Sequence, residues 1–199
     1  MKSSTGRYRI LAVAILTLGV GVAAPANASP ATKFVPAAIT DPAGDVYDDD
    51  DEPTDAPYAD IVSANGRSGA GNLVLTYKTA KALSPLDDPN WESDNTFTDF
   101  LLDTNADGDA DFTVEYAVLD GEQYVDVYQV DDQDDPPALC SGVAAFTSGT
   151  HSATVPLSCL GNPSSLGYRV ETVYDQDVDD DSSLAAYDVA PETGFAKVN

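Results

Sequence analysis

Short runs of alternating apolar and polar residues, each closed by a turn, constrain the fold of this chain most strongly. In "NLVLTYKTA" (72–80), Leu73, Leu75 and Tyr77 fall on one side of an extended backbone, and "DFTVEYAVL" (111–119) repeats the pattern. A period of two indicates strands with one buried face. Four more runs share it: "QYVDVYQV" (123–130), "AAFTS" (144–148), "HSATVPL" (151–157) and "GYRVETVYD" (167–175). Turns about every eight to twelve residues favour an all-β, antiparallel, jelly-roll-like β-sandwich with long acidic loops.

The first 28 residues have the composition of a secretion signal peptide. Lys2, Arg7 and Arg9 precede the apolar run "ILAVAILTLGVGVAA", and "ANA" ends at Ala28. No later stretch approaches the ~20 apolar residues that cross a bilayer, so we expect no membrane insertion. We therefore expect residues 29–199 to form a single β-sandwich domain that is secreted and monomeric.

The charge balance limits the partners of that domain. The signal carries three of the nine Lys and Arg residues and none of the 34 Asp and Glu residues, so six cations minus 34 carboxylates leaves a net charge of −28. Such a surface repels phosphates, which excludes nucleic acid as a partner. Outside a cell the carboxylates favour calcium, a hard cation that prefers oxygen ligands. One histidine and two cysteines offer little to zinc or copper.

The two cysteines predict a disulfide. If Gly149 and Thr150 form a hairpin turn, residues whose numbers sum to 299 face each other, and Cys140 falls opposite Cys159. An exported chain meets an oxidising compartment, where such a pair closes. A redox pair of free thiols would need a C-x-x-C spacing, which the chain lacks.

The stretch "LLDTNADGDADFTVEY" (101–116) predicts a calcium-binding turn between two strands. Pairing residues whose numbers sum to 214 places Leu102 opposite Phe112 and Asp99 opposite Glu115, with 104–110 as the connecting loop. The spacing matches the first nine positions of an EF-hand loop, but Val114 stands at the position of the bidentate glutamate. A solvated polar turn remains the alternative. The candidate ligands are Asp103, Asn105, Asp107, Asp109 and Asp111.

A second candidate metal site lies in "DPAGD", where the Pro and Gly bring Asp41 and Asp45 together in a turn. The stretches 44–55 and 175–181 are also acidic, but they hold too little apolar surface to pack, and we expect charged loops there.

An early "DPAGD", the "ADI" that begins a strand at residues 59–61, and "FLLDTNADGDADF" resemble secreted bacterial modules grouped with family 9 carbohydrate-binding modules and DOMON-like domains. The resemblance extends from about Val35 to Phe195. It implies a jelly-roll sandwich with structural calcium and, in some members, sugar recognition. The best-known members grip sugar with a pair of tryptophans, whereas this chain has only Trp91.

Two places could present aromatic and polar groups to a sugar. Trp91 lies in the loop "SPLDDPNWESDN", and Tyr124, Asp126 and Tyr128 share one face of a strand. Sugars need such mixed surfaces, because they combine C–H patches with hydroxyl groups. The alternative for each place is structural: the tryptophan plugs the end of the sandwich, and the tyrosines belong to the core.

A secreted hydrolase is a further alternative. His151 could act as a base, but no G-x-S-x-G turn is present and Ser152 is simply its neighbour. We therefore expect a non-catalytic, calcium-stabilised module that recognises an extracellular glycan or a surface component. The closest alternative is a protein–protein interaction module, used for adhesion or to inhibit a secreted enzyme.

Overall fold

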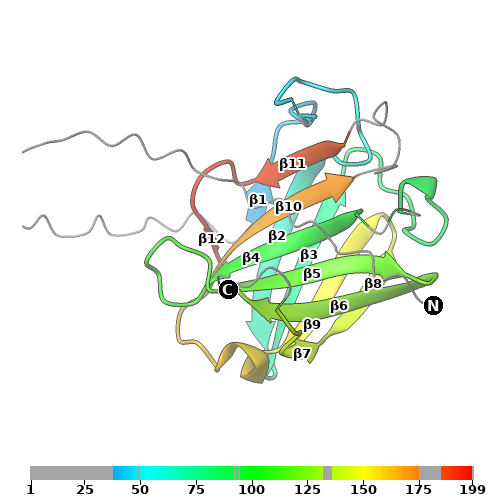
Figure 1. Cartoon of the computed structure of the whole chain (residues 1–199). Coiled ribbons are helices and arrows are strands. Elements are labelled where there is room, and N and C mark those ends of the chain that lie inside the picture. The colour runs from blue at the N-terminus through cyan, green and yellow to red at the C-terminus, as the bar shows by residue number, and fades with distance from the viewer. Residues whose placement is uncertain are drawn as a thin grey trace, which may run out of the picture.

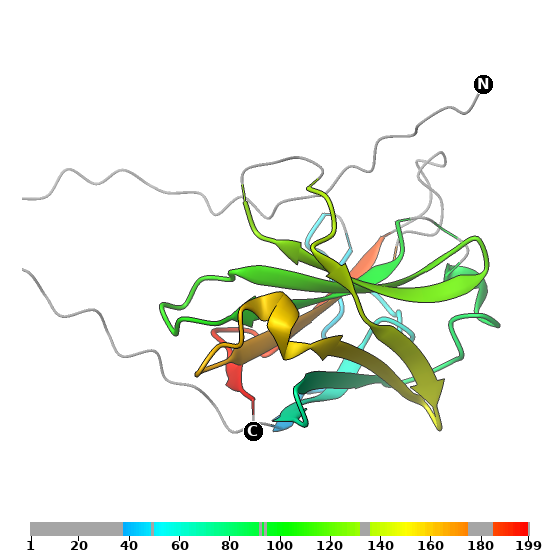
Figure 2. The same ribbon diagram turned by 90° about the horizontal axis from the view of Figure 1, so that it is seen from below.

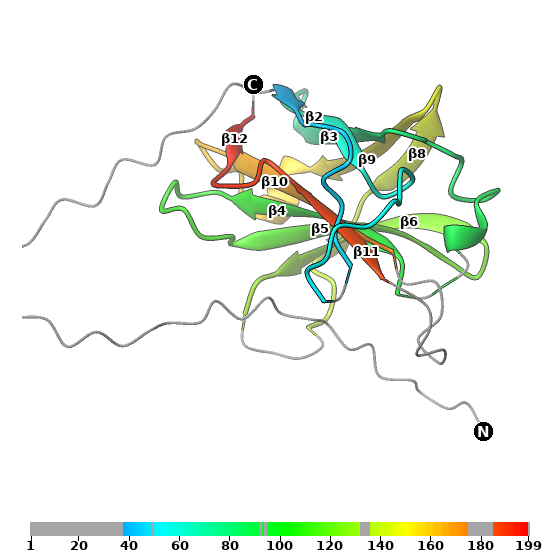
Figure 3. The ribbon, with the colours of Figure 1, turned by 90° about the horizontal axis from the view of Figure 1, so that it is seen from above.

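The computed structural model describes residues 38–48, 50–91, 93, 95–131, 136–174 and 185–198. These residues form two antiparallel sheets packed face to face (Figures 2 and 3). The prediction of an all-β sandwich is confirmed. The expected signal peptide and the acidic stretch 175–181 lie outside the described residues. None of the described helices is long and apolar enough to cross a membrane.

Figure 1 shows how the strands are arranged. The five-stranded sheet has the order β1 (Ala38–Thr40), β2 (Ile61–Gly69), β3 (Asn72–Thr79), β9 (Thr150–Pro156) and β8 (Val143–Thr147). The seven-stranded sheet has the order β11 (Ala186–Ala190), β10 (Gly167–Tyr174), β4 (Phe97–Asp103), β5 (Phe112–Leu119), β6 (Glu122–Gln129) and β7 (Cys140–Ser141), and β12 (Ala196–Lys197) pairs with β10. Two short 3₁₀ helices, η1 (Pro89–Trp91) and η2 (Leu157–Leu160), interrupt the connections.

The alternating pattern places the core between the sheets. Leu73, Leu75 and Tyr77 of β3 are buried, and Val114 and Tyr116 of β5 face them from the other sheet. The predicted strand bounds differ from the observed ones by at most one residue at each end. Period-two alternation located these strands because each one buries a single face.

The predicted β4–β5 register is confirmed, but the predicted β8–β9 register is wrong. Leu102 pairs with Phe112 and Asp99 with Glu115, as the sum of 214 requires. In the other hairpin Thr147 pairs with Thr150, so the turn is Ser148–Gly149 and not Gly149–Thr150. Both turn residues have positive φ, 52° and 73°. A two-residue hairpin loop of this kind matches the twist of its strands.

The disulfide between Cys140 and Cys159 is confirmed, although by a different geometry. Cys140 lies in β7 of the seven-stranded sheet, and Cys159 lies in η2, which follows β9 of the other sheet. The chain crosses between the sheets at Gly142, where a Cβ would lie 2.5 Å from the carbonyl oxygen of Thr154. The disulfide therefore joins the two layers and does not close one hairpin.

Candidate functional site

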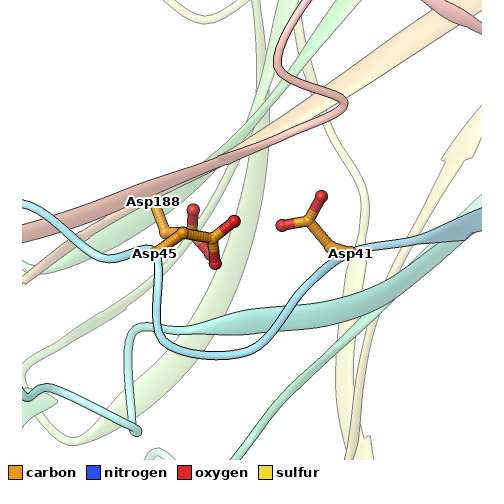
Figure 4. A group of neighbouring side chains, drawn as sticks. All are labelled: Asp41, Asp45 and Asp188. Atoms are coloured by element: carbon orange, nitrogen blue, oxygen red, sulfur yellow. The ribbon is translucent and has the colours of Figure 1, made fainter.

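A cluster of carboxylates lies at the edge of the sandwich where β1 and β11 meet the loop 41–45. Asp41 and Asp45 come from that loop, and Asp188 comes from β11 (Figure 4). One oxygen of each carboxylate lies within 4.8 Å of one oxygen of the other two. Gly44 has a φ of 90°, which lets the loop fold back and bring Asp41 close to Asp45.

Asp60 joins these three residues from the position just before β2. It is only 4% exposed, and its Oδ2 accepts a 2.8 Å hydrogen bond from the Gly44 backbone N–H. Its other oxygen, Oδ1, is buried and accepts no hydrogen bond within the described part of the chain. The same holds for Asp41 Oδ2 and Asp45 Oδ1. We call Asp41, Asp45, Asp60 and Asp188 the carboxylate cluster.

Asp188 is held firmly by the backbone around it. It is 2% exposed, its Oδ2 accepts a hydrogen bond from the N–H of Ile61, and its Oδ1 accepts one from the N–H of Val189. Within β11, Ala186, Asp188 and Ala190 all face inward. An aspartate thus takes a place that the strand pattern would give to an apolar residue.

The electrostatics of the carboxylate cluster are those of crowded negative charge. Burial and the neighbouring carboxylates, Asp188 foremost, raise the pKa of Asp41 to about 7. Burial raises the pKa of Asp188 to about 6, although its two backbone hydrogen bonds act in the opposite direction. Burial also raises the pKa of Asp60, which the Gly44 N–H partly offsets. In the described residues no cationic side chain is a cause of these shifts.

The other predicted metal loop, 103–111, turns its side chains toward its own backbone. Asp103 is fully buried and accepts hydrogen bonds from the N–H groups of Asn105, Ala106 and Gly108. Asp111 accepts bonds from the N–H and hydroxyl of Thr104. Among the described residues these acids do not form a three-carboxylate group like that of Asp41, Asp45 and Asp188. The loop thus closes through hydrogen bonds within the chain, and calcium there stays a prediction.

Asp107 and Asp109 are exposed at the tip of this loop. The N–H of Asp107 donates to the side chain of Asn105, and the N–H of Asp109 donates to the side chain of Asp107. Each is a side-chain turn of the kind that asparagine and aspartate form without a ligand.

Trp91 lies in the interior at one end of the sandwich. It is 3% exposed, and its ring centroid is 5.6 Å from that of Tyr116, 5.4 Å from Tyr174 and 6.0 Å from His151. These contacts match the structural alternative, in which the tryptophan plugs the end of the sandwich.

Tyr124, Asp126 and Tyr128 lie on the outer face of the seven-stranded sheet, because Val125 and Val127 between them face the core. Tyr128 is 9% exposed and Tyr124 is half-buried. The hydroxyl of Tyr124 donates to Glu115, and the hydroxyl of Ser141 donates to Asp126, both at 2.6 Å.

Asp126 belongs to a row of four acids in direct register across four strands, and Tyr124 and Tyr128 border it. Asp126 of β6 pairs with Glu115 of β5, Glu115 with Asp99 of β4, and Asp99 with Glu171 of β10. We call this row the acidic ladder. Arg169 contacts Glu171 at 3.4 Å. Burial raises the pKa of Glu171, and Arg169 partly offsets this effect.

His151 is an interior residue. It is 1% exposed and its ring stacks on that of Tyr77 at 4.4 Å between centroids. Burial lowers its pKa to about 4, so the imidazole is neutral at pH 7. Ser152 follows it in β9 and therefore points to the opposite face of the sheet.

Comparison of the chain with family models, with curated proteins and with solved structures gives no match. The resemblance of the short motifs to carbohydrate-binding and DOMON-like modules therefore stays a prediction.

Proposed function

We propose that this chain is a secreted, non-catalytic β-sandwich module, stabilised by calcium, that recognises an extracellular glycan or surface component. The carboxylate cluster carries the metal part of the proposal. Asp41, Asp45 and Asp188 meet at one edge of the fold, and Asp60 joins them by accepting a hydrogen bond from the Gly44 N–H. Three buried oxygens of these four residues accept no hydrogen bond in the described structure. Bringing like charges together in this way is unfavourable unless a cation or protons offset the repulsion.

The donor set selects among cations. All of the side-chain donors are carboxylate oxygens, which suit calcium and magnesium and not zinc. Calcium accepts six to eight oxygen ligands in flexible geometry, whereas magnesium demands a tight octahedron. The donors come from the loop 41–45, from the residue before β2 and from the edge strand β11. Such a varied set fits calcium, whose coordination geometry is the more flexible. Bound calcium would stabilise the fold by holding β11 to the segment that leads into β2.

The non-catalytic part of the proposal is supported by the position of His151. The histidine is buried among aromatic rings, and the neighbouring serine points away from it. A general base must come within hydrogen-bond reach of the proton that it removes. A neutral imidazole inside the core is poorly placed for that role.

Calorimetric titration of metal-free protein with calcium tests the metal part of the proposal directly. Asp41→Asn and Asp45→Asn should each weaken binding at least tenfold, because each removes a charged ligand. Asp55→Asn is a matched control, since Asp55 is exposed and lies outside the carboxylate cluster. If both cluster variants bind calcium as the control does, the metal part of the proposal is wrong.

One observation favours the alternative function, protein–protein interaction. The edge strand β8, Val143–Thr147, carries no charged residue, and Val143 is 66% exposed. Among the described strands it pairs only with β9. Exposed, uncharged edges accept an extra strand from a partner. Capture of one protein from culture supernatant, lost in Ala145→Lys and kept in Ala145→Ser, would support this alternative.

A further inference from the structure

A pocket opens at the end of the sandwich that Trp91 closes. It lies between the segment 85–91 and the turn that joins β5 to β6, and its volume is about 460 Å³. Small-molecule sites occupy roughly 300–1,000 Å³. We call it the end pocket. Its lining residues include Leu86, Asp87, Asp88, Trp91, Val118 and Asp120.

Exposed apolar side chains gather at the end pocket. Leu86 lines it and is 54% exposed. Leu119, 41% exposed, is the last residue of β5, between the lining residues Val118 and Asp120, and Leu83, also 41% exposed, lies two residues before Pro85. Six large apolar residues of the described chain are exposed, and these are three of them. In a protein with so many carboxylates, an exposed leucine that lines a hollow favours contact with a ligand.

Trp91 is the aromatic residue that lines the end pocket. Its ring packs against those of Tyr116 and His151, which are buried and do not line the pocket. Tyr116 Oη and His151 Nδ1 are buried and have no hydrogen-bond partner within the described residues. The packing among these rings holds Trp91 in place.

The charges around the end pocket are all negative. Asp87, Asp88 and Asp120 line it, and none of its described lining residues is cationic. Asp88 is 4% exposed and its Oδ1 accepts hydrogen bonds from the N–H and side-chain amide of Asn90, which fixes the carboxylate in position. The exposed carboxylates are those of Asp87 and Asp120. A ligand must therefore donate hydrogen bonds to their oxygens, and a ligand with its own carboxylate or sulfate would be repelled.

We infer that the end pocket binds a sugar ring, with the C–H face of the ring against Leu86 and Val118 and its hydroxyl or amino groups donating to Asp87 and Asp120. This inference rests on the proposed glycan recognition and assigns it a place. The mixture of apolar wall and carboxylate acceptors matches what a sugar presents. The charge sets an order of preference: amino sugars first, neutral sugars second and uronic acids last.

Affinity measurements with three probes test the inference: glucosamine oligomers, glucose oligomers and galacturonic acid oligomers. Leu86→Ala should weaken binding of the first two about tenfold, as expected for the loss of one apolar contact. Leu139→Ala is the matched control, because Leu139 is 50% exposed and does not line the end pocket. The double variant Asp87→Asn, Asp120→Asn should remove the preference for glucosamine oligomers, whereas Asp55→Asn should keep it. Melting temperatures within about two degrees of the wild-type value establish that the variants fold.

The outcomes distinguish a failure of the end-pocket assignment from a failure of glycan recognition. If the wild type binds sugar and Leu86→Ala binds as tightly as Leu139→Ala, the end pocket is the wrong site, while glycan recognition stands. If the wild type binds none of the three probes, the pocket inference is overturned. If it also retains a lysine-rich peptide, glycan recognition is overturned as well. Tightest binding to galacturonic acid oligomers would overturn the assignment of the aspartates.

Discussion

Asp188 of β11 accepts a 2.6 Å hydrogen bond from the backbone N–H of Ile61, the first residue of β2, although 127 residues separate the two along the chain. β11 is the edge of the seven-stranded sheet, and β2 belongs to the five-stranded sheet. A single carboxylate therefore contacts both layers and also belongs to the carboxylate cluster. A change at that carboxylate therefore acts on both sheets at this edge.

Calcium should raise the melting temperature. A cation that binds only the folded chain adds about 2.7 kcal/mol at a hundred times its dissociation constant, which corresponds to several degrees for a domain of this size. Chelator should lower the midpoint, and calcium should restore it better than magnesium at equal ionic strength. Thermal scans of the wild type, Asp45→Asn and Asp107→Ala then locate the response. If Asp45→Asn loses the calcium-dependent rise in melting temperature, the ion binds at the carboxylate cluster. If Asp107→Ala loses it, the ion binds in the loop 103–111. Identical wild-type scans in chelator and in calcium would rule out both sites.

Without metal, stability should fall as pH rises. The pKa of Asp41 is about 7 and that of Asp188 about 6 in the folded chain, against roughly 3.9 for an unfolded aspartate. The folded state therefore binds more protons than the unfolded state between about pH 4 and pH 7, and that contribution is lost across this window. Bound calcium replaces the protons and should remove the fall. Melting temperatures of metal-free protein from pH 4 to pH 8 measure this fall in stability, and the fall should be smaller in Asp41→Asn. A metal-free midpoint that climbs throughout the window would contradict the assignment.

Denatured, non-reduced protein should contain no reactive thiol, because Cys140 and Cys159 are joined. Replacing both with serine should cost roughly 3 kcal/mol of unfolding free energy on the loop-entropy account. Thiol titration and denaturant unfolding give the two results. Two titratable thiols per chain would show that the layers are not bridged.

Tyr128→Ala should destabilise the fold by roughly 3–5 kcal/mol, since the side chain is only 9% exposed on the outer sheet face. Tyr124→Phe removes only the hydroxyl that donates to Glu115 and should cost about 1 kcal/mol. Denaturant unfolding compares the two variants. Should Tyr128→Ala keep full stability while losing retention on polysaccharide, the tyrosine would belong to a binding face.

Asp126→Asn should stabilise the chain by up to about 1 kcal/mol in low salt, because it removes one of the like charges that face each other in the acidic ladder. The amide still accepts the hydrogen bond from Ser141. The gain should shrink in high salt, where charges are screened. Asp55→Asn, outside the ladder, supplies the baseline, and a loss of stability at low salt would contradict the repulsion.

Most of the fold could be predicted because its signals are local. Alternation identified six strands, and pairing the residues on either side of the loop 104–110 set the β4–β5 register. The predicted β8–β9 register is wrong because "TSGT" at 147–150 allows two turn positions. The observed turn is Ser148–Gly149, where both residues have positive φ.

The candidate metal site was only half predicted because its members lie far apart in the sequence. Asp41 and Asp45 share one turn, but Asp60 and Asp188 reach them only through packing of the sheets. A usable signal was nevertheless present. In "AYDVA" (186–190) the aspartate occupies the inward phase of an alternating strand, and an acid in that position requires a partner.

The disulfide and the carboxylate cluster lie on opposite lateral edges of the sandwich. One joins β7 to η2, and the other draws β11 toward the start of β2. The two edges are thus closed by different chemistry, one sensitive to reductant and the other to chelator. Local unfolding can accordingly start at either edge. Hydrogen exchange should begin at β1 and β11 when metal is withdrawn, and at β7 and β8 when the disulfide is reduced.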